Sequence, residues 1–300
     1  MKLASGMIQS HYNPVITVIM SVYNNDGYLP EAVESILAQT YKAFEFLIID
    51  DASTDESPAI LKFFARKDPR IICFFNHENR GLTKNLNSLL KQAKGELIAR
   101  MDGDDISCPT RFAEEVQVMM NQGADLVWTN AIFVDDAAHE ICERYQPSLE
   151  DTLARLTDNS RWGNYIVHPS VMFKRQIVLT LGGYDEAYQS GQDGELWSRM
   201  KERGYRFALI EKPLLKYRIA SNSITMQRLG YNDINEMYAY VCLANRQRAK
   251  GWQYIRIIKN PIQKLYLLMR WLAGEDVVYF LKGFRAANYN KIQGSVKSFV

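Results

Sequence analysis

The stretch GELIARMDGDD, residues 95–105, decides how this chain folds and where its chemistry lies. Glu96–Arg100 reads as a strand, and Met101–Asp105 then places three carboxylates within four residues. In open α/β sheets, ligands bind at the carboxyl ends of the strands. Carboxylates this close repel one another unless a cation lies between them, and a hard divalent ion that holds a diphosphate binds one or two carboxylates. The stretch therefore favours a metal and phosphate site at a strand end.

One alternative for MDGDD stays open and another is excluded. Asp and Gly are both turn formers, so a solvated acidic turn is the alternative. A calcium-binding EF-hand loop is excluded, because its sixth position would be Ser107 instead of Gly and its twelfth Ala113 instead of Glu.

The surrounding sequence alternates between strands and helices. Val15–Val22 (VITVIMSV) and Phe44–Asp51 (FEFLIIDD) are continuous apolar runs, typical of parallel strands buried on both faces. We expect further strands at 70–75, 96–102 and 124–130, and helices at 29–41, 57–66, 83–93 and 111–121, with Ser57 as N-cap and Pro58 as first residue of the second helix. This rhythm predicts an α/β fold with a mostly parallel, Rossmann-like sheet and helices on both faces.

The alternation weakens after residue 134. Segments 148–158 and 193–203 are expected to be helical, and 168–174 and 205–217 extended. From residue 232 onward the pattern is that of amphipathic helices, interrupted by Gly251 and Pro261. We expect one large domain over residues 1–231, with a nucleotide-binding half at 14–134 and an acceptor half at 135–231, and a basic helical extension at 232–300.

Composition points to a reduced, cytoplasmic setting. The four cysteines form no C-x-x-C pair, so neither a zinc site nor a disulfide framework is indicated. The first residues lack the apolar segment of a secretory signal, and no run of 18 apolar residues occurs.

His11, His77 and His139 have no metal-binding spacing. Because Walker A and G-x-G-x-x-G sequences are absent, kinase and dehydrogenase functions are disfavoured.

The net charge of +2 conceals an asymmetry. Residues 246–300 contain 11 Lys or Arg residues and two acidic residues, a formal charge of +9, which leaves −7 for the remainder. Such a split suggests that the basic segment meets an anionic surface.

Acidic residues also mark two other expected strand or helix ends. Asp51 follows the second strand, where its carboxylate could accept a hydrogen bond from a base N–H, or could cap the turn that follows. Asp193 precedes a helix, where it could be a catalytic carboxylate or a helix N-cap.

Eight segments in order resemble glycosyltransferase family 2, the inverting nucleotide-sugar transferases of GT-A fold. The resemblance covers residues 14–225, and its segments are SVYNNDGYLPEAVESILAQTY (21–41), IIDDASTD (48–55), NRGLTKNLN (79–87), GELIARMDGDD (95–105), HPSVMFKR (168–175), GGYDE (182–186), QDGELWSRM (192–200) and YRIASNSIT (217–225).

The resemblance implies a role for particular residues. Ser21, Val22 and Tyr23 match the loop that lines the nucleoside pocket, Asp51 matches the acid that contacts uracil, and Arg80 and Lys84 lie in the segment that reaches the base and diphosphate. Asp102, Gly103 and Asp104 match the D-x-D motif, with Asp102 and Asp104 as metal ligands and Asp104 and Asp105 nearest the ribose and metal. Asp193 matches the general base, while His168, Trp197 and Arg199 match the acceptor side.

One departure affects the expected metal site. The family often has a histidine in the segment that here reads Tyr217-Arg218-Ile219-Ala220-Ser221, and this chain has Ala220. Either Ser221 or Asn222 substitutes as a ligand, or fewer protein groups hold the metal.

We therefore expect an inverting glycosyltransferase that uses Mn²⁺ or Mg²⁺. It would move a hexose or N-acetylhexosamine from a UDP-sugar to a hydroxyl of a glycan or lipid-linked oligosaccharide, as in bacterial surface-polysaccharide synthesis. No nucleic-acid partner is expected. The alternatives are a sugar-phosphate nucleotidyltransferase, which would need a basic Gly-rich loop after the first strand, and a non-catalytic nucleotide-sugar-binding protein.

The extension at 246–300 has two interpretations. Its apolar and aromatic residues alternate with cations, as in helices that lie in the membrane interface, so it could dock the enzyme on the inner face of a membrane. The alternative is a helical cap that packs on the domain or forms a homodimer contact.

Overall fold

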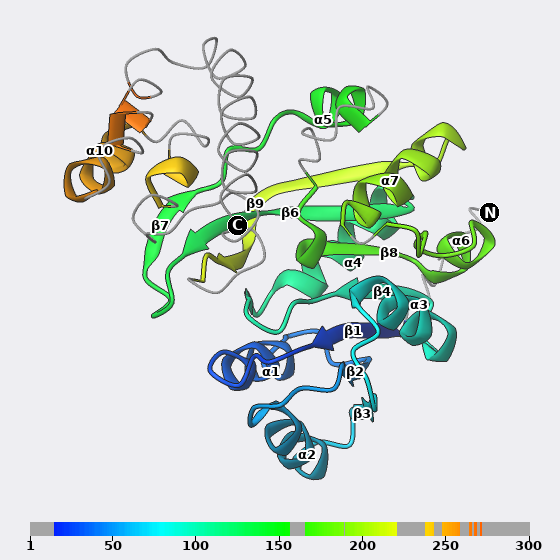
Figure 1. Ribbon diagram of the computed structural model, residues 1–300. Coiled ribbons are helices and arrows are strands. Elements are labelled where there is room, and N and C mark those ends of the chain that lie inside the picture. Colours follow the sequence, from blue (N-terminus) through cyan, green and yellow to red (C-terminus); the bar gives the residue numbers. More distant parts are fainter. Residues whose placement is uncertain are drawn as a thin grey trace, which may run out of the picture. The chain divides into compact units, whose positions relative to one another are not determined.

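The computed structural model describes residues 15–156, 166–188, 190–220, 238–242, 248–258, 264, 265, 267, 268 and 271 (Figure 1). The chain divides into two compact units. The first comprises residues up to Ile132 together with Gln146–Arg218, and the second comprises Phe133–Tyr145 together with the chain from Ile219 onward. The predicted domain boundary at residue 231 lies outside the described residues.

The first unit begins with the expected alternation of strands and helices. Its elements are β1 (Ile16–Val22), α1 (Leu29–Leu37), β2 (Phe44–Asp50), α2 (Ser57–Lys67), β3 (Ile71–Phe75), α3 (Leu82–Gln92), β4 (Leu97–Arg100), β5 (Ile106–Ser107), α4 (Arg111–Gln122) and β6 (Leu126–Val134), the last of which ends in the second unit. Apart from the short β5, each of these elements was predicted from the sequence.

The rest of the first unit completes the sheet. Its elements are α5 (Leu149–Leu156), the 3₁₀ turn η1 (His168–Ser170), β8 (Val171–Lys174), α6 (Arg175–Thr180), α7 (Gln192–Glu202) and β9 (Phe207–Arg218). The expected strand at 168–174 is shorter than predicted, because Pro169 lies in the 3₁₀ turn.

The strands form a mixed sheet in the order β3-β2-β1-β4-β8-β6-β9-β5. The pairs β1–β2, β1–β4 and β2–β3 are parallel. Strand β8 is antiparallel to both β4 and β6, so β6 runs in the same direction as β4 without touching it. The mostly parallel α/β sheet is confirmed, with an antiparallel insertion that sequence periodicity did not predict.

Alternate residues of the strands face two apolar layers. Val18 and Met20 face one side of β1, where α1, α2 and α4 pack, and Ile19 faces the other, where α3, α6 and α7 pack. Since successive side chains of a strand point to opposite faces, a continuous apolar run is what a strand covered on both sides requires.

Two predicted helix termini are corrected. Helix α1 ends at Leu37, four residues before the expected end. Helix α2 begins at Ser57, with Glu56 as N-cap, so Ser57 is not the cap. The reason is that the Asp55 Oδ1 accepts the amide of Ser57 at 3.0 Å, whereas the Ser57 hydroxyl accepts the amide of Asn25 at 3.0 Å.

The second unit contains β7 (Glu140–Glu143), which pairs with β6, and α10 (Arg248–Ile257). Ala239, Ile255, Ile258 and Leu267 form its apolar cluster. Trp252, Ile257 and Leu265 are exposed by 38, 54 and 57%. None of the helices in the described part of the chain has the length and hydropathy that a transmembrane span requires.

Gly95 provides a stability test, because it lies against the backbone at the start of β1. A Cβ on Gly95 would lie 2.7 Å from the carbonyl carbon of Ile16 and even nearer the amide nitrogen of Thr17. We expect Gly95→Ala to lower the free energy of unfolding by about 1–3 kcal/mol, as overpacking does. Thermal melting measures this. Gly27→Ala is the control, since a Cβ there meets nothing within 4 Å, and equal melting temperatures for the two variants would contradict the prediction.

Candidate active site

The carboxyl ends of β1, β2 and β4 meet at one edge of the sheet. Ser21 and Val22 pair with Ile49 and Asp50, and Ile19 pairs with Arg100, all in parallel register. The loops that follow these strands therefore lie side by side, as the sequence predicted.

Hydrogen bonds join the loop after β1 to the loop after β2. The Asn24 amide donates to the Ser53 hydroxyl at 2.9 Å, and the Thr54 amide donates to the Asn24 Oδ1 at 2.8 Å. Asn24 and Ala52 both have left-handed backbone conformations, with φ of 48° and 61°. Non-glycine residues in this region are strained, so the hydrogen bonds hold both loops in a conformation that each would otherwise avoid.

Asp51 organises the loop that precedes α3. Its carboxylate, 2% exposed, accepts the amides of Arg80 and Gly81 at 2.8 and 2.9 Å and the Asn76 side-chain amide at 2.8 Å. Burial opposes ionisation of Asp51, but these hydrogen bonds outweigh it and lower its pKa. The turn-capping role considered for Asp51 belongs to Asp50, whose Oδ2 accepts the Ser53 amide at 3.2 Å. The uracil contact of Asp51 stays a prediction.

Two asparagines that sequence reasoning missed extend this network to β1. Asn76 donates to the Asn85 Oδ1 at 2.9 Å, and Asn85 donates to the Ser21 hydroxyl at 3.0 Å. Asn85 is 1% exposed. The expected nucleoside-pocket residues Ser21 and Asp51 are thus connected through the side-chain amides of Asn76 and of the buried Asn85. Tyr23, Arg80 and Lys84 are exposed beside this network.

Asp102, Asp104 and Asp105 form a cluster in which carboxylate oxygens lie within 4.8 Å of one another. Burial, then the charge of Asp102, raises the pKa of Asp104 to about 7. Burial and the neighbouring Asp104 raise the pKa of Asp105 well above its usual range, and the Asp105 Oδ2 is a buried atom without a hydrogen-bond partner among the described residues.

These features fit a divalent cation. Oxygen ligands are what Mg²⁺ and Mn²⁺ prefer, and a cation would offset the repulsion among the carboxylates that raises the pKa values of Asp104 and Asp105. Ala220, at the position where a histidine was considered, is apolar and 1% exposed, so it offers no side-chain ligand. Ser221 and Asn222, the two substitutes considered, lie outside the described residues.

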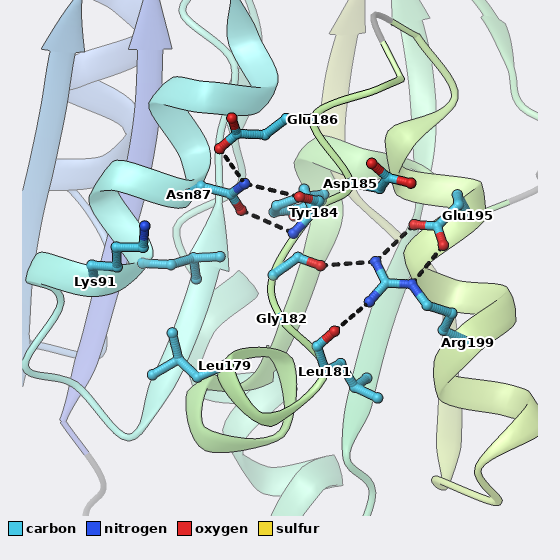
Figure 2. A pocket seen from close by; sticks show the side chains of 12 residues that line it. Asn87, Lys91, Leu179, Leu181, Gly182, Tyr184, Asp185, Glu186, Glu195 and Arg199 are labelled. Carbon is cyan, nitrogen blue, oxygen red and sulfur yellow. Dashed lines mark hydrogen bonds and ion pairs between the residues drawn. The ribbon is translucent and has the colours of Figure 1, made fainter.

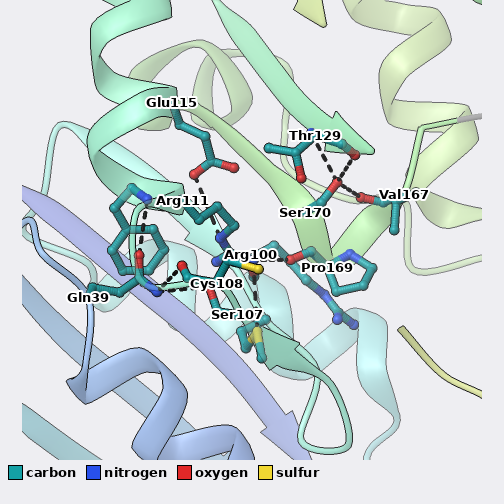
Figure 3. Close-up of polar contacts among 12 residues, drawn as sticks. Gln39, Arg100, Ser107, Cys108, Arg111, Glu115, Thr129, Val167, Pro169 and Ser170 are labelled. Carbon is teal, nitrogen blue, oxygen red and sulfur yellow. Dashed lines mark hydrogen bonds and ion pairs between the residues drawn. The ribbon is translucent and has the colours of Figure 1, made fainter. Parts of the chain in front are cut away.

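Three buried arginines hold the acidic loop in place. Arg100, 1% exposed, forms an ion pair with Asp102. Arg111, fully buried, donates to the carbonyls of Pro169 at 2.7 Å and Arg100 at 3.2 Å (Figure 3). The amide of Arg218 donates to the Asp105 Oδ1 at 2.9 Å, and its Nε donates to the carbonyl of Asp104 at 2.8 Å. None of the three arginines was predicted as a site residue.

Gly103 allows this loop to approach the loop after β1. A Cβ on Gly103 would lie 2.9 Å from the Asn25 Nδ2 and 3.5 Å from a methyl group of Val22. The glycine of the D-x-D motif is therefore explained by close packing between two site loops.

Asp193 lies in the first turn of α7. The helix begins at Gln192, and its N-cap is Gly191, which makes no side-chain capping bond. The alternative that Asp193 is the helix N-cap is therefore wrong. Asp193 is half-buried. Its negative charge, like that of Asp102, raises the pKa of the Tyr184 hydroxyl. Its role as general base stays a prediction.

The three residues expected on the acceptor side occupy different environments. His168 is half-buried, and its Nε2 lies 2.9 Å from the Tyr184 hydroxyl. Trp197 is fully buried and packs on His168 and Phe173. Arg199 pairs with Glu195 and donates to two loop carbonyls. The structure thus gives Trp197 and Arg199 packing and anchoring contacts, whereas direct acceptor contact stays a prediction.

Comparison with known proteins identifies the family. The model of the family described as "Glycosyl transferase family 2" matches residues 17–179. The chain belongs to this family, and it is therefore a glycosyltransferase.

Two curated relatives cover most of the chain. The putative glycosyltransferase EpsE of Bacillus subtilis is 32% identical over 83% of this chain and 89% of its own length. The O-antigen biosynthesis glycosyltransferase WbnJ of Escherichia coli is 30% identical over 72% of this chain and 84% of its own.

Two solved structures share the fold. S. aureus TarS, residues 1–349 in complex with UDP-GlcNAc, has a TM-score of 0.55 and 19% identity, covering 86% of this chain and 71% of that one. The mannosyltransferase PcManGT of Pyrobaculum calidifontis, in complex with GDP-Man and Mn²⁺, has a TM-score of 0.51 and 20% identity, covering 92% and 81%.

The raised pKa of Asp104 predicts pH-dependent metal binding. Below pH 7 a proton occupies Asp104 and competes with the cation, so Mn²⁺ affinity should fall as the pH is lowered from 8 to 6, approaching about tenfold per pH unit at the acid end. Titration calorimetry with Mn²⁺ alone measures this. Asp104→Asn is the control, in which affinity is weaker and the pH dependence is smaller, since only Asp105 then retains a raised pKa. Equal wild-type affinity at pH 6 and 8 would contradict the prediction.

Proposed function

We propose that this protein is a metal-dependent, inverting glycosyltransferase that moves a hexose or N-acetylhexosamine from a UDP-sugar to a hydroxyl of a glycan acceptor. The observation that carries the proposal is the cluster of Asp102, Asp104 and Asp105 beside the linked loops of Ser21 and Asp51. The candidate cation ligands and the residues expected to contact the base then lie at one sheet edge. The UDP-GlcNAc bound to TarS supports the uridine donor, whereas the GDP-Man of PcManGT makes guanosine the competing base.

Donor binding would use both parts of this edge. Asp102 and Asp104 would hold Mn²⁺ or Mg²⁺, with Asp105 fixing the loop through Arg218. When bound, the cation neutralises charge on the leaving diphosphate. Asp51 would accept the base N–H, and the exposed Arg80 and Lys84 would approach the phosphates.

Transfer would need a base on the far side of the donor sugar. Asp193 would take the proton of the acceptor hydroxyl as its oxygen bonds to the anomeric carbon. The bond from that carbon to the phosphate oxygen breaks, and the nucleoside diphosphate leaves with the electron pair. Attack opposite to the leaving group inverts the anomeric centre, which gives a β-linkage from an α-linked donor.

The setting we propose is the synthesis of a bacterial surface polysaccharide on a lipid-linked acceptor at the inner face of the cell membrane. The E. coli relative named for O-antigen biosynthesis supports the surface-polysaccharide setting. In the second unit, the exposed Trp252, Ile257 and Leu265 combine with the +9 charge of residues 246–300, which suits an interfacial helix.

Removing the charge of Asp193 tests the function directly. Wild-type protein with Mn²⁺ should release UDP from at least one of a panel of UDP-sugars, and GDP-mannose is the competing donor in the same assay. Asp193→Asn should lower the rate by about 10²–10⁴-fold, as loss of a general base does. Its melting temperature should change little, since a first-turn carboxylate contributes about 0.3–1 kcal/mol through the helix dipole. A folded Asp193→Asn protein with the wild-type rate would refute the role of Asp193.

Membrane docking predicts a salt-sensitive association with anionic lipid. Full-length protein should sediment with phosphatidylglycerol vesicles at low salt and stay in the supernatant with phosphatidylcholine vesicles, because each Lys or Arg near an anionic surface contributes roughly 1 kcal/mol. High salt should release it. Protein that remains in the supernatant with both lipids would favour the packing or homodimer role of the extension.

A further inference from the structure

The loop Leu181–Glu186, the first part of the connection between α6 and α7, is held by two side chains from two helices. Asn87 of α3 accepts the Tyr184 amide at 2.9 Å, and it donates to the Tyr184 carbonyl at 2.8 Å and to the Glu186 carboxylate at 3.0 Å. This one side chain thus satisfies both backbone groups of Tyr184, as a neighbouring strand would.

Arg199 of α7 holds the same loop from the other side. Its Nη1 donates to the Leu181 carbonyl at 2.7 Å, and its Nη2 donates to the Gly183 carbonyl at 2.8 Å. Glu195 fixes the guanidinium with two short bonds, at 2.5 and 2.7 Å (Figure 2). We call the two side chains Asn87 and Arg199 the loop clamp.

Backbone hydrogen bonds at the end of α6 also hold the start of this loop: the amides of Gly182 and Gly183 donate to the carbonyls of Leu179 and Val178 at 3.0 and 2.9 Å. The loop borders an open cavity of about 620 Å³, which is also lined by Leu90, Lys91 and Leu179. Both glycines of the loop have positive φ, 89° at Gly182 and 80° at Gly183. A Cβ on Gly183 would lie 2.6 Å from the Asn87 Oδ1, whereas a Cβ on Gly182 would meet nothing within 4 Å.

The clamp fixes the backbone of Tyr184, and the Tyr184 ring packs against the rings of His168 and Trp197. The Tyr184 ring is 1% exposed, and its hydroxyl lies 2.9 Å from the His168 Nε2. Burial raises the pKa of Tyr184, and burial together with the charge of Arg100 lowers the pKa of His168. Both groups are therefore neutral, and the stronger donor of the two is the phenol O–H. Donation from the phenol to Nε2 places the proton of His168 on Nδ1.

Charged residues of the acidic loop and the proposed base both act on the hydrogen bond between Tyr184 and His168. The charges of Arg100, Asp193 and Asp102 all act on the Tyr184 hydroxyl. Arg100 also acts on His168 and pairs with Asp102. His168 and Tyr184 thus share an environment with the acidic cluster and with the proposed base.

We infer that Asn87 and Arg199 are positioning residues for the acceptor side of the site. They fix the loop Leu181–Glu186, and through the Tyr184 hydroxyl they hold His168 as a neutral wall residue with its proton on Nδ1. His168 then takes no part in proton transfer through Nε2, which leaves that task to Asp193. The inference rests on the proposed function for the identity of the acceptor side, but not for the state of His168.

The test is the ring ¹⁵N spectrum of histidine-labelled full-length protein. The chain has four histidines, and the spectrum of His168→Gln assigns the signal of His168. Wild type should show Nδ1 protonated and Nε2 as an acceptor at neutral pH. Gly183→Ala pushes on Asn87, and Asn87→Asp replaces the donor to Tyr184 and Glu186 by an acceptor. Both variants should move the Nε2 signal of His168 toward that of free imidazole, in which the two tautomers are averaged. Gly182→Ala, with an equally positive φ, should leave the signal unchanged.

Kinetics separate positioning from a loss of structure. In Asn87→Asp, Mn²⁺-dependent UDP affinity should stay within about twofold of wild type, while UDP release from the active donor falls about tenfold or more, as small misplacements near reacting groups cause. Arg199→Lys should act in the same direction, because an ammonium cannot bind two carbonyls in the guanidinium geometry.

Three results would overturn the inference. The first is a His168 signal in Gly183→Ala and Asn87→Asp that matches Gly182→Ala. The second is loss of cooperative melting in both variants, which would make the clamp a folding requirement. The third is a tenfold loss of UDP affinity in Asn87→Asp. If wild type releases no nucleotide from any donor while the His168 signals change as expected, the proposed function fails and the clamp stands.

Discussion

Burial of three guanidinium groups around the acidic loop is the constraint on which the rest of this structure depends. Arg100, Arg111 and Arg218 are each no more than 2% exposed, and a charge removed from water is tolerated when it is paired or hydrogen-bonded. Their partners are the groups that shape the site: the carboxylate of Asp102, the carbonyls of Arg100, Asp104 and Pro169, and the Glu31 carboxylate at 2.6 Å. The position of the acidic loop is therefore fixed before any donor binds. Catalysis that relies on preorganised charge needs a loop of this kind.

Burial and hydrogen bonding also separate two groups of side chains at the sheet edge. Side chains that hold backbone, such as Asp51 on the amides of Arg80 and Gly81, are buried, while Tyr23, Arg80 and Lys84 remain exposed. The buried polar side chains are fixed by their hydrogen bonds, whereas the exposed side chains can change conformation. On the proposed function, the exposed side chains would make the contacts that differ between donors, as loops on α/β sheets commonly do.

Local patterns predicted most of the first unit, and contacts distant in sequence were what they missed. Continuous apolar runs located β1 and β2, and helical spacing located α3 and α7 within one residue at each end. The antiparallel placement of β8 between β4 and β6 depends on pairing across the sheet, which no local period records. Asn87 and Arg218 were missed for the same reason, since their partners lie 97 and 114 residues away. The acids of the D-x-D motif could be found because their mutual repulsion is itself visible in the sequence.

The hydrogen bonds that join the loops after β1 and β2 have a consequence for the exchange of parts between family members. Asn24 contributes both an amide to Ser53 and an acceptor to Thr54, and it does so from a left-handed conformation that its own sequence does not impose. The conformation of each loop therefore depends on the other loop. A chimaera that takes one loop from a relative would lose the hydrogen bonds between the two loops. The acquired loop would no longer be held in its original conformation, so its nucleoside preference would be less well defined. On the proposed function, donor specificity would therefore be inherited in pairs of loops, and recombination within the family should succeed most often when its crossovers fall outside residues 21–57.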